Sequence, residues 1–471
     1  MKMFIGGTWI DKPQKIEVRS PFDNTMVDTV PKGDVADVDA ALAGAVEGAK
    51  IMRAMPAYER YRILAKAARL MYDRREQLAR IISQEEGKIL GESLVEAARA
   101  AETMELSAEE AKRITGEVLP LDAASHGAKK FGFTLRVPCG VVACITPFNF
   151  PLNLPCHKVG PALAAGNSVV LKPASDTPLS SLALVEILLE AGLPPLAIAC
   201  ITGSGAAIGD ALASDSRIRK ISFTGSQEVG EHIMSKAGLK RVTMELGSNC
   251  PVIVMDDADL NKAAEAIVAT GYSNAGQVCI SAQRVLAVPQ VYNDLVDMLK
   301  PKVAALRTGN PLDSQTKMGP MIRQADAERV QKWIGEAVSS GARVVTGGGR
   351  EGTMHEPTLV ADVAPEMRIS CDELFGPAVA VTAVKDIDQA IALANDTRYG
   401  LSASIFTENI GRALRFAREA DSGNIHINWG PQWRADMMPY GGLKDSGMGK
   451  EGPKYAVLEM TELKMVVVHG L

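Results

Sequence analysis

Residues 141–172 read VVACITPFNFPLNLPCHKVGPALAAGNSVVLK and contain two apolar runs with a helical segment between them. Val141 to Ile145 and Ser168 to Lys172 are short, apolar and typical of buried strands. Residues 154–165 have the composition of a helix, so the stretch predicts a strand–helix–strand unit with parallel strands. The same alternation continues with a helix at 179–191, a strand at 198–202, a helix at 206–213 and a strand at 220–223.

A second alternating set follows Glu245. Strands are expected at 252–255, 284–288, 343–345, 378–384 and 401–406, and helices at 259–269, 292–305, 324–339, 387–395 and 410–420. Nearer the beginning, short strands are expected at 7–10 and 16–18, joined by a turn at Pro13, and helices at 61–86 and 90–114. Because 471 residues exceed one ordinary core, we expect an α/β protein with at least two domains.

Composition and charge narrow the classes of function. Apolar residues make up 46% of the chain and the net charge is −5, which speaks against nucleic acid or an anionic membrane as a partner. The beginning of the chain lacks the apolar run of a signal peptide, and no run reaches the roughly 18–20 residues of a membrane span. Seven scattered cysteines without a CxxC spacing favour a reducing, cytoplasmic setting. The six histidines form no HExxH or HxxxH pattern, so no metal site is predicted.

Two segments depart from the α/β alternation. Residues 122–130 are polar and turn-like, and residues 131–137 then alternate as in one strand of a hairpin or extended arm. Residues 461–469 form an apolar strand, and an exposed strand of this kind invites pairing with another chain. We therefore expect this strand to pair with the hairpin arm of another subunit.

A single cysteine stands in the stretch Tyr272-Ser273-Asn274-Ala275-Gly276-Gln277-Val278-Cys279-Ile280-Ser281. Most lone cysteines are inert core residues, and this one could be too. Two other stretches favour a reactive thiol: Met244-Glu245-Leu246-Gly247-Ser248-Asn249 supplies a carboxylate, and Thr146-Pro147-Phe148-Asn149-Phe150-Pro151 supplies an amide. A thiol, a carboxylate and an amide are the groups needed for covalent chemistry on a carbonyl.

Three stretches are candidates for binding a nucleotide. Residues 203–209 read GxGxxxG, one residue longer than the usual dinucleotide fingerprint. Phe223-Thr224-Gly225-Ser226 follows a strand and precedes a helix, so backbone N–H groups and the Ser226 hydroxyl could hold a phosphate. Lys172-Pro173-Ala174-Ser175 ends another strand, where ligands gather in open α/β sheets. The Lys172 ammonium is either a ribose partner or a solvated lysine at the end of a strand.

Together these motifs resemble those of the aldehyde dehydrogenase superfamily. The matching segments are, in order, 147–151, 172–175, 223–226, 245–247, 276–279, 373–377 and 439–442. They span nearly the whole chain. The resemblance implies a Rossmann-like cofactor domain at 1–118 and 139–246, an α/β catalytic domain at 247–445, and a small β oligomerisation element at 119–138 and 446–471 that forms a homodimer or homotetramer.

The same resemblance implies the catalytic roles. Cys279 would attack the aldehyde carbon as a thiolate, and the Asn149 amide with the Cys279 backbone N–H would form the oxyanion hole of the hemithioacetal. After hydride transfer to a nicotinamide, Glu245 would activate the water that hydrolyses the thioester. Lys158 either assists electrostatically or is a surface lysine. Ser248 replaces the second glycine of the usual Glu-Leu-Gly-Gly, and catalysis should survive because both residues are small.

The cofactor is expected to be NADP or NAD. Glu373 would hold the nicotinamide ribose beside Phe375, and Lys172 would bind the adenosine ribose. The other residues expected near the cofactor are Thr146, Pro147, Phe148, Ser175, Gly205, Phe223, Gly225, Ser226 and Val229. Many NAD-preferring relatives carry glutamate where this chain has Ser175, and a serine does not repel a 2′-phosphate. We therefore expect NADP to be accepted.

A small hydroxylated or anionic aldehyde is the expected substrate. Enzymes similar to succinate-semialdehyde dehydrogenase bind the remote carboxylate with arginines at positions that here are Ser273 and His157. The run at 432–439 is instead similar to the lactaldehyde-dehydrogenase-like branch. The predicted pocket residues are His157, Val278, Ile280, Trp429, Trp433 and Arg434, with a structural salt bridge as the alternative role of Arg434.

Two other functions are alternatives to hydrolytic aldehyde oxidation. A CoA-acylating relative would release the thioester with CoA, but such relatives commonly lack the carboxylate at the position of Glu245. A catalytically inactive family member with a structural role would have no need of Cys279, Glu245 and Asn149 together.

Overall fold

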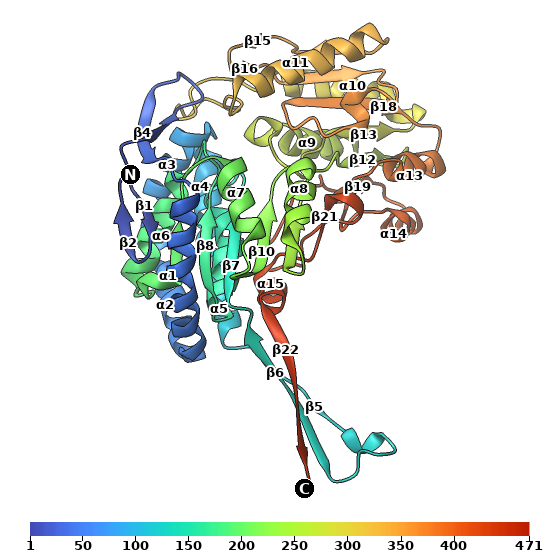
Figure 1. The fold of residues 1–471 in the computed structure, drawn as a ribbon. Coiled ribbons are helices and arrows are strands. Elements are labelled where there is room, and N and C mark those ends of the chain that lie inside the picture. Colours follow the sequence, from blue (N-terminus) through green and yellow to red (C-terminus); the bar gives the residue numbers. More distant parts are fainter. Residues whose placement is uncertain (471) are drawn as a thin grey trace.

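The computed structural model describes residues 1–470 and contains two α/β sheets, from which a narrow arm extends (Figure 1). The first sheet consists, in spatial order, of β2 (Thr8–Ile10), β1 (Met3–Ile5), β9 (Ile198–Cys200), β8 (Ser168–Lys172), β7 (Val141–Ile145), β10 (Ile218–Thr224), β11 (Arg241–Glu245) and β21 (Gly447–Met448). Its five central strands, from β9 to β11, are parallel. The predicted strand–helix–strand unit is therefore confirmed.

Side chains alternate across this sheet into two cores. Val142 and Cys144 of β7 pack on one face, whereas Val141 and Ala143 pack on the other. The first face is covered by α2 (Ala57–Asp73), α3 (Arg75–Glu86), α4 (Leu90–Ala111), α5 (Asn153–Ala164) and α6 (Leu179–Ala191), and the second by α1 (Val35–Ala54), α7 (Gly205–Ser214) and α8 (Gln227–Ala237). Burial on both faces explains why the strand sequences are continuously apolar.

The second sheet carries its own core. Its strands are, in spatial order, β14 (Arg343–Thr346), β17 (Thr358–Ala361), β18 (Ala378–Ala383), β13 (Arg284–Ala287), β12 (Pro251–Val254), β19 (Ser402–Phe406) and β20 (Asn424–Ile427). All are parallel to their neighbours except β14. Around it lie α9 (Leu260–Gly271), α10 (Pro289–Ala304), α11 (Gln324–Ser339), α12 (Arg368–Cys371), α13 (Ile387–Asn395), α14 (Ile410–Glu419) and the small hairpin of β15 (Arg350–Glu351) and β16 (Met354–His355).

The arm is a three-stranded sheet in the order β22–β6–β5 (Figure 1). Strand β22 (Thr461–His469) pairs antiparallel with β6 (Lys130–Pro138) over nine residues, and β5 (Val118–Leu119) covers part of the other edge. The terminal strand therefore pairs with the hairpin of its own chain, whereas the expected pairing with the hairpin of another subunit stays a prediction. The chain's own hairpin reaches it, because β6 leads directly into β7 and β22 follows α15 (Pro453–Glu459), which packs on α5.

Other sequence expectations need correction. The predicted helix at 61–86 is two helices, α2 and α3, which meet at Arg74 with φ −104° and ψ 13°. The two short strands near the beginning do not pair with each other: β2 pairs with β1, and β3 (Lys15–Arg19) pairs with β4 (Met26–Pro31). Residues 446–460 lie with the first sheet, since β21 extends it and α15 packs against its helices, so only β22 belongs to the arm.

No helix within residues 1–470 is long and apolar enough to cross a membrane. In the same residues no three His, Cys, Asp or Glu side chains gather closely enough to hold a metal ion.

Candidate active site

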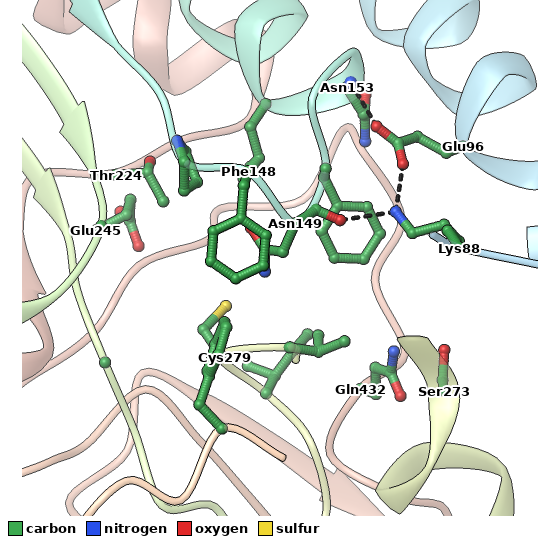
Figure 2. Close-up of a pocket in the computed structure, with 18 of the residues that line it drawn as sticks. Lys88, Glu96, Phe148, Asn149, Asn153, Thr224, Glu245, Ser273, Cys279 and Gln432 are labelled. Carbon is green, nitrogen blue, oxygen red and sulfur yellow. Dashed lines mark hydrogen bonds and ion pairs between the residues drawn. The ribbon is translucent and has the colours of Figure 1, made fainter. Parts of the chain in front are cut away.

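A cavity of about 900 Å³ lies where the two α/β units meet, and it brings the three predicted catalytic residues together (Figure 2). Cys279, Glu245 and Asn149 all line it. In Figure 2, Cys279 lies between Glu245 and Thr224 on one side and Gln432 and Ser273 on the other. The carboxyl ends of the parallel strands β7, β10 and β11 supply this side of the cavity, as expected for ligand sites in open α/β sheets.

The cysteine is presented by a strained turn. After α9, the chain takes positive φ angles at Asn274 (49°), Ala275 (53°) and Gly276 (70°). Gly276 is required there, because an added Cβ would lie 2.1 Å from the carbonyl oxygen of Gly376. The Cys279 sulfur lies 3.3 Å from the Tyr440 hydroxyl. Burial raises the pKa of the thiol to about 12, and the hydrogen bond from Tyr440 opposes that rise.

Asn149 is tied to the loop that carries the cysteine. Its side-chain amide donates a hydrogen bond to the Gln277 carbonyl at 2.9 Å, two residues before Cys279. Its side-chain oxygen is buried and has no hydrogen-bond partner in the described residues. The amide group has a second N–H, and in Figure 2 the side chain lies beside the Cys279 sulfur. The residue can therefore donate to an oxygen formed next to that sulfur.

Glu245 ends β11 as a buried carboxylate. Neither of its oxygens has a hydrogen-bond partner among residues 1–470, and the side chain comes close to Gly441, where an added Cβ would lie 2.8 Å from Oε1. Burial raises the pKa of Glu245 well above its ordinary value, and the negative charge of Glu451 raises it further. An unsatisfied carboxylate in an apolar pocket favours its neutral form and is a stronger base once it is ionised.

Behind these residues runs a buried chain of charged groups. Glu451 pairs with Lys158 at 2.8 Å and with Arg434 at 3.2 Å, and these positive charges lower the pKa of Glu451 to about 2. Asp436 pairs with His157 at 2.8 Å and accepts two hydrogen bonds from Arg99. Lys158 is thus not a surface lysine, because its side chain is fully buried. The salt bridge considered for Arg434 is present, yet this side chain also lines the cavity and its Nε has no partner in the described part of the chain.

The start of a helix faces the cavity where β10 leads into α8. Ser226 caps that helix by accepting a hydrogen bond from the Val229 N–H at 3.4 Å. Gly225 lies directly on the Phe223 ring, since an added Cβ would be 2.4 Å from its Cζ. The hydroxyl of Thr224 is buried without a partner in residues 1–470. A helix start beside a buried hydroxyl without a partner has the donors that a phosphate group would need.

A second carboxylate stands at the same end of the cavity. Glu373 accepts a hydrogen bond from the Ser248 N–H at 2.8 Å, and burial raises its pKa to about 7. Phe375 has a positive φ of 48°, and its ring meets that of Phe148 edge-on at 6.0 Å. This part of the cavity is lined by Phe148, Phe375 and Glu373. The two rings form an aromatic wall, and the carboxylate can accept hydrogen bonds from the hydroxyl groups of a sugar.

Lys172 and Ser175 lie outside the cavity lining, at the end of β8. The Lys172 ammonium is buried and donates to the Pro173 carbonyl at 2.8 Å, and burial lowers its pKa to about 8. The Ser175 hydroxyl donates to the Gly203 carbonyl at 2.8 Å. The alternative of a solvated lysine is therefore wrong. Thr146, Gly205, Phe223 and Val229 also lie outside the lining, and Val229 is exposed at the start of α8.

Three predicted pocket residues are not in the cavity. Trp429 and Trp433 are exposed, with 39% and 58% of their surface accessible, and His157 is buried behind Arg434. The prediction for Trp429 and Trp433 assumed that their whole segment faces inward, whereas His157 was expected from its position in the family resemblance; none of the three lines the cavity. Within that segment only Gln432 and Arg434 reach the cavity, whereas Val278 and Ile280 line it as expected.

Sequence reasoning missed several lining residues. Tyr440, which touches the cysteine, lies in a motif that had been recognised without a role for its side chain. Lys88, Glu96 and Arg99 come from the loop before α4 and from α4 itself, where charges look like an ordinary solvated face. What distinguishes these residues is that the charged side chains around 85–96 are buried. Because burial is not visible in a single sequence, no sequence signal could have indicated them.

With this geometry, comparison with known proteins identifies the family. Residues 9–466 match the model of the aldehyde dehydrogenase family, and the chain belongs to it. It is therefore an oxidoreductase.

Among its relatives, the 3-sulfolactaldehyde dehydrogenase of Priestia megaterium is 46% identical, with 99% of this chain and 98% of that protein covered. The lactaldehyde dehydrogenase of Methanococcus aeolicus is 38% identical, with coverage of 99% and 100%. The structure of the NADP-dependent glyceraldehyde-3-phosphate dehydrogenase of Bacillus halodurans complexed with NADP superposes with a TM-score of 0.97, at 36% identity and with 100% and 99% of the two chains covered. The predicted fold class and family are confirmed.

Proposed function

We propose that this protein oxidises a small hydroxylated or anionic aldehyde to its carboxylic acid, with NADP or NAD as the oxidant and water as the final nucleophile. The observation that carries the proposal is the convergence of Cys279, Asn149 and Glu245 on one cavity. The start of α8, which lines the same cavity, supports a site for the phosphates of the cofactor. Nucleophile, oxyanion donor, base and cofactor site are the parts that this reaction requires.

In the proposed first step the Cys279 thiol gives up its proton to solvent, the sulfur bonds to the aldehyde carbon, and the electron pair of the C=O double bond moves to the oxygen as negative charge. Asn149, held by its bond to the Gln277 carbonyl, has a second N–H to donate to that oxygen together with the Cys279 backbone N–H. One such donor is typically worth roughly 3–4 kcal/mol of transition-state stabilisation. A bound NADP or NAD would supply the two-electron oxidation by taking up the hydrogen of that carbon as hydride. The acyl group then remains on the sulfur as a thioester.

Glu245 is proposed to release the product. A water molecule attacks the thioester while the Glu245 carboxylate takes one of its protons, and the acid leaves as the Cys279 sulfur is freed. The raised pKa of Glu245 suits this role, because it makes the ionised carboxylate a stronger base toward water. The presence of Glu245 argues against CoA as the acceptor of the acyl group. The presence of Cys279, Glu245 and Asn149 in one cavity argues against a catalytically inactive family member.

The residues present fit a dinucleotide cofactor. The unused Thr224 hydroxyl, Gly225 and the start of α8 would hold the pyrophosphate, and Glu373 would accept from the nicotinamide ribose. Lys172 would bind the adenosine ribose. Ser175 places no negative charge beside that ribose, which supports acceptance of NADP. The NADP complex of the similar glyceraldehyde-3-phosphate dehydrogenase is consistent with this.

The side of the cavity lined by Arg434, Arg99 and Gln432 is proposed to bind the substrate. Arg434 and Arg99 line it, and the Arg434 Nε and the Gln432 Oε1 are buried without partners within residues 1–470. A donor and an acceptor left unused suit a substrate with both an anionic group and a hydroxyl. The relatives named for 3-sulfolactaldehyde and lactaldehyde support the same class.

The test is an aldehyde panel with NADP or NAD, with and without CoA, followed by absorbance of the reduced cofactor and by identification of the acid. We expect acid without CoA, and a higher kcat/KM for 3-sulfolactaldehyde and lactaldehyde than for propanal. Acyl-CoA formation would establish the CoA-acylating alternative, and inactivity on the whole panel would establish the structural one. A cytoplasmic location and assembly as a homodimer or homotetramer are parts of the same proposal. Fractionation and sedimentation test them.

A further inference from the structure

A buried ion pair lies directly beside the oxyanion loop. Lys88 precedes α4 and Glu96 lies within it, and each side chain is only 1% exposed. Figure 2 shows the pair next to Asn149 and Asn153, with dashed lines from Lys88 to both Glu96 and Asn149. Neither residue takes part in the chemistry described above, so their burial beside it calls for another explanation.

The contacts of the pair are directed at the backbone of residues 149–153. The Lys88 ammonium donates to the Asn149 carbonyl at 2.6 Å and lies 4.0 Å from the centre of the Phe150 ring. Glu96 Oε1 accepts from the N–H groups of Leu152 and Asn153, at 3.0 and 3.2 Å, while its Oε2 faces the ammonium. The pair therefore holds the loop at the Asn149 carbonyl and again at the N–H groups three and four residues later.

The cysteine loop is fastened to the same point. The side-chain amide of Asn274 donates to the Asn149 carbonyl at 3.3 Å and to Glu86 at 2.8 Å, and its backbone N–H donates to Glu92. One carbonyl thus accepts from Lys88 and from Asn274. Because Asn274 is the first residue of the strained turn before Cys279, this carbonyl links the two loops that form the oxyanion hole.

A simple contribution to stability does not explain the pair well. Burying two charges costs several kcal/mol per ion, and well-packed apolar residues of similar size are often as stabilising. An ion pair does fix the positions of the groups that it contacts, since each of its hydrogen bonds has a preferred geometry. A donor to an oxyanion must be placed accurately, because a displacement of about 1 Å can lower the rate roughly 10²-fold.

We propose that Lys88 and Glu96 are positioning residues that fix the Asn149 carbonyl, and through it the relative placement of the Asn149 amide and the Cys279 loop. The pair acts on the reaction through the backbone and touches no reacting atom. The inference rests on the proposed function. The proposed function is tested first: it would be refuted by an inactive wild-type protein or by a Cys279→Ala variant with full activity. Variants of Lys88 and Glu96 then test the further inference alone.

The test compares Lys88→Met and Glu96→Gln with Lys220→Met as the matched control. Lys220 is also fully buried, and it donates to Thr243 instead of to either catalytic loop. Glu96→Gln keeps the size of the side chain but replaces one acceptor oxygen by an NH₂ group. In one orientation this NH₂ group faces the Lys88 ammonium, and in the other it faces the N–H groups of Leu152 and Asn153, so a donor always opposes a donor. Glu96→Gln is the second variant if Lys88→Met does not fold.

We expect kcat per titrated active site to fall about 10²-fold in Lys88→Met and about tenfold in Glu96→Gln, while the KM for NADP stays within about threefold. The pH profile of Cys279 alkylation should not move, since the thiol itself is unchanged. Lys220→Met should lose thermal stability without loss of kcat. The proposal is overturned if a folded Lys88→Met or Glu96→Gln retains wild-type kcat, or if Lys220→Met loses kcat to the same extent.

Discussion

Burial should keep Cys279 as a neutral thiol in the cofactor-free protein, and this can be measured. Its pKa is raised to about 12, with burial as the largest cause, and the nearby Cys250, Glu373 and Glu245 add to the rise. At about pH 8, a thiol of pKa about 12 is ionised to roughly 10⁻⁴, compared with roughly 10⁻¹ for a pKa of 9.0. Alkylation requires the thiolate, so Cys279 should react about 10³-fold more slowly than an ordinary thiol.

The assay is inactivation by iodoacetamide over a pH series, with the modified cysteine identified by mass spectrometry. Cys279→Ala gives the background, and free cysteine alkylated in parallel is the reference for an ordinary thiol. Tyr440→Phe removes the hydrogen bond that lowers the pKa, so alkylation at Cys279 should slow further. A rate that levels off below about pH 9 would refute this reasoning, because the site would then stabilise the anion by means that burial and Tyr440 do not supply.

Four further outcomes are expected from three substitutions. Glu245→Gln should give a burst of about one reduced cofactor per subunit and a steady-state rate lowered about 10²–10⁴-fold, and a normal steady state would exclude Glu245 as the base. The same substitution should raise thermal stability at neutral pH but not in acid: the folded pKa of Glu245 is raised, so stability is lost as pH climbs above the ordinary carboxyl range. Gly247→Ala places a Cβ 2.4 Å from Glu373 Oε2 and should raise the KM for NADP about tenfold; an unchanged KM would show that Glu373 does not hold the cofactor. Asp436→Asn weakens the pairing with Arg99 and His157, and the ratio of kcat/KM for lactaldehyde to that for propanal should fall, whereas a constant ratio would separate this pair from substrate choice.

The elements that sequence predicted well are those with a strong local signal. Strands buried on both faces, such as β7 and β8, are continuously apolar, and their alternation with helices leaves few topologies. The helix predicted at 61–86 failed at Arg74 because the apolar periodicity on both sides of the break stays in phase. The pairing of β22 could not be predicted, since a strand's sequence does not say which hairpin lies within its reach.

For the site, sequence showed the reacting groups but not their surroundings. Cys279, Glu245 and Asn149 stand in recognisable motifs, and the structure brings them to one cavity. Lys88 and Glu96 stand in no motif, because a lysine and a glutamate eight residues apart are indistinguishable from solvated charges until their burial is known. The orientation of a single loop decided which side chains around 429–434 enter the cavity, and one sequence holds no signal for that orientation.

The pairing within the arm has a consequence for synthesis of the chain. β6 and its partner β22 are joined by hydrogen bonds between residues 130 and 469, a separation of 339 residues. At roughly 5–20 residues per second, translation would leave the long edge of β6 unpaired for about 17–70 s. A nascent chain with an open strand edge is at risk of pairing with its neighbours on the same messenger. Slower elongation should therefore favour aggregation of this protein more than that of a protein whose strands pair locally.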